Sequence, residues 1–165
     1  MPPPRYLIVA GIVRQAEKIL LVKQQGADDA FPTWALPGGV VEQGELLTEA
    51  LAREVLEETG LEVIEVGSLV YATQLDNRKR KRQSIVFVFE VNQWRGVPGS
   101  NDPDDLIQDV AFVSPDEAIA KLSALPWRIM KEPILAYLKG DTGFKRVWLY
   151  RNDGQWEEPD LVAVL

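Results

Sequence analysis

The chain has 165 residues, of which 46% are hydrophobic and 26% are charged, and its net charge is −7. This length and composition are typical of one globular domain with a sizeable core. The sequence contains no cysteine and no histidine, which excludes disulfides, thiolate-bound zinc and a histidine general base. Any metal must therefore be held by oxygen, which favours magnesium, manganese or calcium.

The acidic balance also bears on partners and location. It argues against broad nucleic-acid binding through a basic surface, although it permits a local basic patch. The N-terminal stretch MPPPRYLIVAGIV lacks the basic start and long apolar run of a signal peptide, and no segment reaches transmembrane length. We therefore expect a cytoplasmic protein.

The N-terminal part of the chain predicts paired strands followed by a helix. Residues 5–14 and 18–25 are short β-rich runs separated by a polar turn. After a loop, residues 45–59 have the pattern of a helix. Gly60 is well placed to end this helix in a left-handed conformation.

Three further strands are predicted in the second half. Residues 61–75 alternate apolar and polar side chains, and residues 83–94 give a clearer strand. The polar segment 76–82 lies between them and predicts the tip of a hairpin. A Pro/Gly/Asp-rich loop then leads to a strand over 109–114.

The remaining elements are two helices and a terminal hairpin. Ser114 is expected to cap a helix whose first residue is Pro115, and a second helix is expected over 128–138. The tail, residues 144–165, predicts a hairpin that turns at Asp153-Gly154. Strands around one early helix, with helices later, indicate an α/β domain with a mixed sheet.

Three glutamates lie on an unexpected side of the first helix. At about 100° per residue, Glu54 and Glu58 continue the apolar stripe that contains Leu47 and Leu51, and Glu57 is adjacent. The helix dipole disfavours negative charge in the last turn by roughly 0.3–1 kcal/mol per group. Like charges four residues apart add about 0.2–0.5 kcal/mol per pair. A divalent cation held by these hard oxygens offsets the repulsion; the alternative is simple exposure to solvent.

Residues 39–61, GVVEQGELLTEALAREVLEETGL, resemble a complete Nudix box, G-x5-E-x7-R-E-U-x-E-E-x-G-U with U an aliphatic residue. Every fixed position is matched, by Gly39, Glu45, Arg53, Glu54, Val55, Glu57, Glu58, Gly60 and Leu61. The strand order around the box also resembles the family up to about residue 140. The resemblance implies an α/β fold, a Nudix-like α/β/α sandwich with a mixed sheet, over residues 1–140. Residues 141–165 would be a C-terminal β-hairpin extension packed on the same domain or on a partner subunit.

The resemblance further implies hydrolysis of the pyrophosphate linkage of a nucleoside di- or triphosphate, or a derivative, by metal-activated water. By motif position, the Mg²⁺ ligands would be Glu54, Glu57, Glu58 and the Gly39 carbonyl, and Mn²⁺ is a possible substitute. Glu54 or Glu57 would also orient or deprotonate the water. Arg53 would join this catalytic group and form the structural ion pair of the family with Glu45. An exposed bridge worth under about 1 kcal/mol is the alternative for that pair.

Many family members use another acidic residue from a later loop as a ligand or base. The candidates are Asp102, Asp104, Asp105 and Asp109, and Asp105 is preferred for its distance ahead of the strand at 109–114. Glu90, inside a strand, is a weaker candidate. The alternative is that these are ordinary loop aspartates.

Two features offer contacts to the substrate. The run RKRKR at 78–82, with Arg78 and Arg80, predicts a phosphate or RNA contact, or else a solvated tip that blocks edge aggregation. Trp34 is placed to stack on a nucleobase or, in the favoured alternative, to anchor its loop in the core. Tyr71 and Phe87 are expected in the core or on a sheet face.

Three aromatic residues of the tail, Trp148, Tyr150 and Trp156, predict a self-association surface, hence a possible homodimer, or a base-stacking lid. Signatures of ADP-ribose and dinucleoside polyphosphate hydrolases are missing around Asp76 and Arg78, which leaves a nucleoside di- or triphosphate as the default substrate. An RNA 5′-end pyrophosphohydrolase is the alternative if residues 78–82 are functional. A catalytically inactive ligand-binding module is a further alternative, against which the intact box argues.

Overall fold

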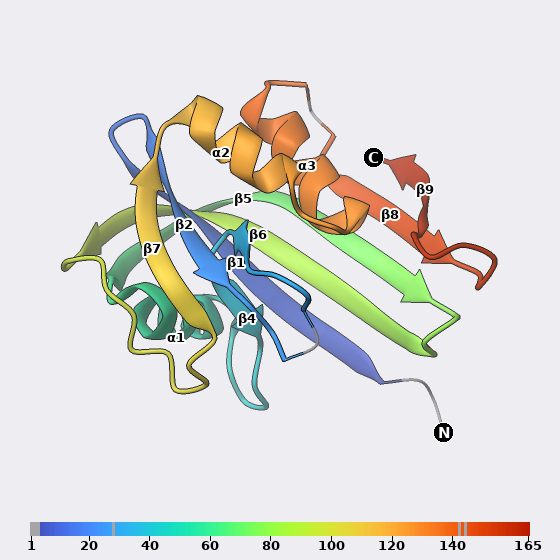
Figure 1. Cartoon of the computed structure of the whole chain (residues 1–165), viewed down its shortest axis with the longest axis horizontal. Helices are drawn as coiled ribbons and strands as arrows, with labels where there is room; N and C mark the ends of the chain where they lie inside the picture. Colours follow the sequence, from blue (N-terminus) through green and yellow to red (C-terminus); the bar gives the residue numbers. More distant parts are fainter. Residues whose placement is uncertain (1–3, 28, 142, 144) are drawn as a thin grey trace.

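The computed structural model describes residues 4–27, 29–141, 143 and 145–165 (Figure 1). In chain order its elements are β1 (Arg5–Gln15), β2 (Lys18–Gln24), β3 (Thr33–Ala35), β4 (Gly38–Val40), α1 (Leu47–Thr59), β5 (Glu62–Asn77), β6 (Arg82–Arg95), β7 (Ile107–Val113), α2 (Pro115–Ser123), α3 (Arg128–Leu138), β8 (Val147–Asn152) and β9 (Asp160–Val164).

A mixed sheet forms the centre of the molecule. Its strand order is β3-β2-β1-β6-β5-β8-β9, and β4 pairs with β1 while β7 pairs with β2. The β5–β6 hairpin is antiparallel, whereas β1–β6 and β5–β8 are parallel pairs. Parallel neighbours cannot be joined by a tight turn, so these two pairings bring together segments that are far apart in sequence.

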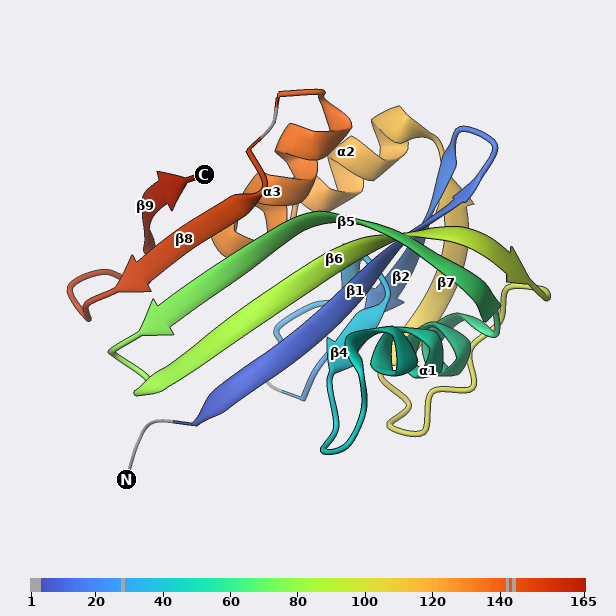
Figure 2. The same ribbon diagram turned by 180° about the vertical axis from the view of Figure 1, so that it is seen from behind.

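The helices cover the two faces of this sheet separately. Helix α1 lies on one face, and α2 and α3 lie on the other, as the two opposite views show (Figures 1 and 2). Each face has its own buried cluster: Leu51 and Val55 of α1 pack with Val9 and Val13 on one side. The other cluster includes Ile134 of α3. The arrangement confirms the predicted α/β/α sandwich.

The predicted start of the first helix is wrong by two residues. Helix α1 begins at Leu47 because Glu45 belongs to a turn, in which the Glu45 amide donates to the Glu42 carbonyl at 3.1 Å. The Glu45 carboxylate accepts the Glu42 amide at 2.8 Å and so closes that turn. Glu49 then accepts the Leu46 amide at 2.7 Å at the start of the helix.

The predicted helix caps are confirmed. Gly60 has φ 72°, and its amide donates to the Leu56 carbonyl, which would otherwise be one of the unpaired carbonyl groups in the last turn of α1. A Cβ at Gly60 would lie 2.5 Å from the Gly99 carbonyl oxygen, so glycine is required for close packing as well as for the turn. Ser114 and Glu117 cap α2 reciprocally, through bonds of 3.2 and 3.0 Å.

The C-terminal hairpin extends the main sheet of the same chain. Strand β8 pairs with β5, and β9 pairs with β8 beyond a connection that runs from 153 to 159 instead of turning tightly at Asp153-Gly154. Trp148 and Tyr150 are only 9% and 3% exposed, in the core beneath α3. The prediction that they form a self-association surface or a lid is therefore wrong, because their own domain buries them. Trp156 is 66% exposed, and a dimer contact there stays a prediction.

Among the residues that the structure describes, no helix is both long and apolar enough to cross a membrane.

Candidate active site

The acidic end of α1 lies against β4, the short strand that contains Gly38 and Gly39. The Gly38 amide donates to Glu58 Oε2 at 2.9 Å, which joins β4 to the last turn of the helix. Gly38 is closely surrounded, since a Cβ there would lie 2.2 Å from the Val9 carbonyl oxygen. Gly39 faces the helix directly, and its added Cβ would meet Glu54 Oε1 at 2.4 Å. Gly38 therefore allows β4 to pack closely on β1, and Gly39 allows the backbone to approach the Glu54 carboxylate.

Arg53 organises the carboxylates around it. Its guanidinium donates to both oxygens of Glu45, at 2.7 and 3.0 Å, a bidentate geometry that fixes direction as well as distance. The same group donates to Glu54 at 2.8 Å and to Glu57 at 3.4 Å. A further bond of 3.1 Å to the Val40 carbonyl ties the arginine to β4. Arg53 is thus a structural hub, and more than the exposed bridge that was the alternative.

The electrostatics of the three glutamates differ. Burial, together with the charges of Glu54, Asp102 and Glu57, raises the pKa of Glu58 to about 8, against the lowering effect of the Gly38 amide. Burial also raises the pKa of Glu54, while its hydrogen bond to Arg53 lowers it. The hydrogen bond from Arg53 lowers the pKa of Glu45 to about 2. The negative charge of the helix therefore exceeds what one arginine neutralises.

This donor set fits a divalent metal. Carboxyl oxygens next to the backbone of β4, in a cluster with more acidic groups than Arg53 pairs with and with no soft ligand, suit Mg²⁺ or Mn²⁺. Over the described ranges, no group of three or more acidic side chains is arranged so that it could hold a metal ion; Arg53 bonds Glu54 and the Gly38 amide bonds Glu58. Mg²⁺ is commonly bound by one or two carboxylates together with waters and substrate phosphates. The assignment of the individual ligands stays a prediction.

The loop between β6 and β7 packs against the same end of α1. The Asn101 amide donates to the Glu57 carbonyl at 2.9 Å. Asp102 is the loop aspartate whose charge raises the pKa of Glu58, and its carboxylate also accepts the Leu106 amide at 2.6 Å. Asp105, the residue preferred from the sequence, is exposed and has a left-handed backbone, with φ 55°. Its role as a ligand stays a prediction, and Asp102 is an acidic neighbour that sequence spacing did not single out.

Glu90 belongs to a different environment. It accepts a hydrogen bond from the Tyr137 hydroxyl of α3, on the face of the sheet opposite α1. It therefore cannot reach the acidic cluster, and the weaker candidacy assigned from the sequence is wrong. Phe87, three residues earlier in β6, packs on the face of the sheet that α1 covers, as expected of a sheet-face residue.

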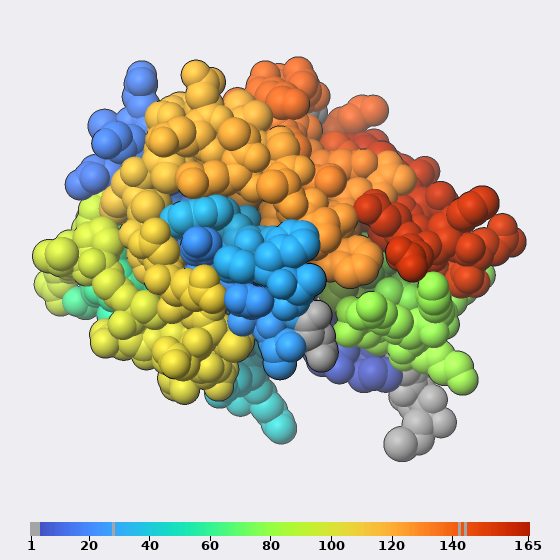
Figure 3. Space-filling model, in the orientation of Figure 1, coloured from blue at the N-terminus to red at the C-terminus, as the bar shows by residue number. Residues whose placement is uncertain are grey.

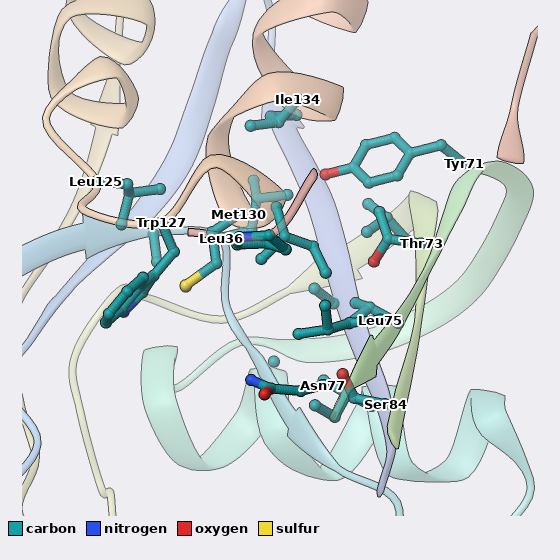
Figure 4. A pocket seen from close by; sticks show the side chains of 18 of the residues that line it. Leu36, Tyr71, Thr73, Leu75, Asn77, Ser84, Leu125, Trp127, Met130 and Ile134 are labelled. Atoms are coloured by element: carbon teal, nitrogen blue, oxygen red, sulfur yellow. The ribbon is translucent and has the colours of Figure 1, made fainter. Parts of the chain in front are cut away.

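A cavity of about 460 Å³ lies between the sheet and the α2–α3 segment (Figure 4). Its volume lies within the range of small-molecule sites. One wall is the row of alternate β5 side chains Tyr71, Thr73, Leu75 and Asn77, and facing it are Leu125, Trp127, Met130 and Ile134. Gly38 also lines the cavity. The Gly38 amide bonds Glu58, so Gly38 links the lining of the cavity to the acidic end of α1, whose three glutamates do not themselves belong to that lining.

The predicted substrate contacts have different surroundings. Trp34 packs against the core with Lys121 Nζ 4.4 Å from its ring centroid, which fits the anchoring alternative. Arg78 pairs with Asp76 at 3.2 Å. Arg80 lines the cavity, and its guanidinium lies 5.9 Å from the ring centroid of Trp127. The polar wall residues were missed as contacts because alternation along β5 predicts a buried face but not an empty space beside it.

The fold and this site define a domain in which a glycine-containing strand, β4, faces an acidic helix, and one of its glycines also lines a ligand-sized cavity. The model of the NUDIX domain matches residues 4–137, and the chain therefore belongs to the Nudix family of hydrolases. The nucleoside triphosphatase NudI of Escherichia coli is 32% identical over 122 residues, which are 68% of this chain and 84% of that protein.

Two other proteins illustrate the range of the similarity. The ADP-ribose pyrophosphatase of Methanocaldococcus jannaschii is 43% identical over 86 residues, 50% of this chain and 49% of that protein, so the match spans about half of that relative. A NUDIX hydrolase structure from Nitrosomonas europaea has a TM-score of 0.67 at 27% identity, covering 84% of this chain and 90% of that one.

Proposed function

We propose that this protein is a Mg²⁺-dependent pyrophosphohydrolase that cleaves the phosphoric anhydride of a nucleoside di- or triphosphate or a derivative. The observation that carries the proposal is the acidic end of α1, where Glu58 and Glu54 lie against Gly38 and Gly39 of β4 and Gly38 also lines a cavity. The names of its relatives, a nucleoside triphosphatase and an ADP-ribose pyrophosphatase, support a substrate of this class.

Glu54, Glu57, Glu58 and the Gly39 carbonyl would hold the metal, and Asp105 remains a candidate for a further ligand. When bound, Mg²⁺ neutralises diphosphate oxygens and acidifies a bound water, the usual contribution of a divalent ion to such a reaction. Glu54 or Glu57 would orient that water and accept its proton. Arg53 keeps Glu54 and Glu57 in place through its bonds to both.

The cavity is the proposed site of the nucleoside. Its lining is mostly apolar near Leu36, Val86 and Ile134, which suits the faces of a base. Polar groups stand along β5, where Figure 4 shows the Tyr71 hydroxyl and the Asn77 amide directed into the space. With Gly38 at one end, a diphosphate attached to that nucleoside would lie beside the acidic helix.

A substrate panel tests the proposal. The protein is incubated with Mg²⁺ and nucleoside di- and triphosphates, ADP-ribose, nucleotide sugars, dinucleoside polyphosphates or triphosphorylated RNA, and released phosphate and pyrophosphate are measured. Turnover of at least one anhydride, abolished by EDTA, is expected. Absence of turnover on the whole panel would reject the proposal in favour of the ligand-binding module.

A further inference from the structure

The basic tip at residues 78–82 divides into two groups. Lys79, Arg80 and Arg82 are among the residues that line the cavity. Arg78 pairs instead with Asp76, and Lys81 has a left-handed backbone, with φ 49°, at the turn itself. The tip is therefore more than a solvated turn, since three of its cations belong to the rim of a cavity whose lining also includes Gly38, the partner of Glu58.

The tip and the acidic cluster stand far apart along the sheet. Pairing across the sheet aligns Gly38 with Ala10, Ala10 with Val88, and Val88 with Tyr71. The tip begins after Asn77, six residues further along β5, which is roughly 20 Å at about 3.4 Å per residue. The two views of the ribbon also place α1 and this tip at opposite ends of the sheet (Figures 1 and 2).

This separation determines what the rim cations can do. Exposed charges more than about 8 Å apart are largely screened at physiological salt, so the rim does not neutralise Glu54, Glu57 or Glu58. A diphosphate held at the acidic end is also too short to reach the rim. Positive charge at the far end of a nucleoside-sized cavity suits a second anionic group on the same ligand.

The rim is built from several elements. Arg80 lies over Trp127 from the α2–α3 segment, a cation–π contact that holds the guanidinium at the mouth. The β8–β9 connection contributes Glu157 and Pro159, and Figure 3 shows it beside the tip and the α2–α3 segment on one face. Just inside, Asn77 is buried and its side-chain oxygen accepts the Arg80 amide at 2.9 Å, which fixes the turn. Glu157 is the anion in this lining, against three cations.

We propose that Lys79, Arg80 and Arg82 select a nucleotide that carries a second phosphoryl group beyond the scissile anhydride. This inference rests on the proposed function, because it takes the nucleoside to occupy the cavity with its diphosphate at α1. Two sources supply such a group: a phosphate monoester on the ribose of a small nucleotide, or the next phosphodiester at the 5′ end of an RNA. The C-terminal hairpin, through the Glu157 loop, is part of the selecting surface.

Kinetics on matched substrates test the proposal. Nucleoside 5′-diphosphates with and without a 3′-phosphate are compared with a 5′-diphosphorylated dinucleotide, for each of the four bases, in Mg²⁺. We expect kcat/KM about tenfold higher when the second phosphate is present, as for one good charge contact, and a smaller ratio at high salt. Preference for the monoester identifies a small nucleotide, and preference for the dinucleotide identifies an RNA end. Equal kcat/KM on all three overturns the proposal while leaving the proposed function intact.

Adjacent residues of equal charge provide the control. Arg82→Gln, and more strongly Arg80→Gln/Arg82→Gln, should lower kcat/KM on the doubly phosphorylated substrates far more than on the plain diphosphate and so remove the preference, whereas Lys81→Gln should retain the preference. If Lys81→Gln reduces the ratio as much as Arg82→Gln, only net charge matters and the assignment fails. Glu157→Gln should increase the ratio.

Calorimetry in EDTA measures nucleotide binding without turnover, and so tests the selective rim separately from the proposed hydrolysis. Nucleoside 3′,5′-bisphosphates should bind about tenfold more tightly than 5′-monophosphates, as expected for one added charge contact. Such a preference without any turnover on the substrate panel would reject the proposed function but keep the selective rim. Turnover without the preference would do the reverse.

Discussion

The acidic cluster of α1 and the basic tip at 78–82 are both runs of like charge, but the fold holds them differently. Glu54 and Glu58 are half-buried or buried and each is fixed by a hydrogen bond, from Arg53 and from the Gly38 amide. The tip residues are exposed, and their order comes from the turn and from Trp127. The difference shows that charge density alone does not define a site: what matters is whether burial and fixed partners make the charges costly without a ligand.

The largest predicted effect comes from removing one fixed charge. Glu57→Gln should lower kcat by about 10³-fold, because it removes a proposed metal ligand and a candidate base at once. Turnover of the best substrate is measured at saturating Mg²⁺. Glu62→Gln is the control, since Glu62 is exposed and pairs with Arg95. Wild-type kcat in Glu57→Gln would remove the site assignment and erase the difference between the clusters.

Gly39→Ala tests whether position, apart from charge, matters. The added methyl group would meet the Glu54 carboxylate at 2.4 Å, so the carboxylate must move. A displacement of about 1 Å near the reacting groups costs about 10²-fold in rate. Gly99→Ala is matched, because its Cβ meets nothing within 4 Å. Equal activity of the two variants would show that the close approach at Gly39 has no functional role.

Replacing the partner of Arg53 should have a smaller effect. Glu45→Gln should lower kcat/KM about tenfold, as loss of a supporting interaction around a metal site typically does. It should also change the response to acid. The pKa of Glu45 falls from 4.5 to about 2 in the folded protein, so its stabilisation is full above pH 4.5 and is lost as pH falls towards 2.

Urea unfolding measured at several pH values tests whether the stabilisation by Glu45 decreases as the pH falls. The stability difference between wild type and Glu45→Gln should be largest at neutral pH and should shrink as the pH falls from 4.5 to 2. A difference that is constant over this range would show that the ion pair with Arg53 contributes nothing.

The smallest effect is predicted at the basic tip. Lys81→Gln should change the free energy of unfolding by no more than about 0.5 kcal/mol, since exposed substitutions away from special contacts rarely do more. Thermal unfolding measures this. A loss well above about 0.5 kcal/mol would mean that Lys81 makes a fixed contact that the tip is not expected to have.

The sequence predicted those parts of the fold that depend on local pattern. A glycine directly after the last turn of α1 predicts the C-terminal cap at Gly60, and Ser114-Pro115 predicts the start of α2. The Nudix box predicted the pairing of Arg53 with Glu45, because the motif fixes which side chains meet. The residues that give these signals are close together in sequence, in or next to one helix, where sequence spacing determines which side chains meet.

The remaining features depend on contacts between distant segments. Trp148 is buried because β8 pairs in parallel with β5, and no local pattern specifies a partner so far away in sequence. The approach of Asp102 to Glu58 depends on how the β6–β7 loop folds back onto α1. The cavity combines residues from Ile8 to Pro159, so its volume and its basic rim arise only in the assembled fold.

Diffraction from crystals soaked in Mn²⁺ tests the central claim most directly. The claim is that the carboxylates of Glu54, Glu57 and Glu58 are tolerated together because a divalent ion binds among them. An anomalous peak within coordinating distance of these oxygens and of the Gly39 carbonyl is the predicted result. Carboxylates that point apart, with no peak between them at saturating Mn²⁺, would contradict it.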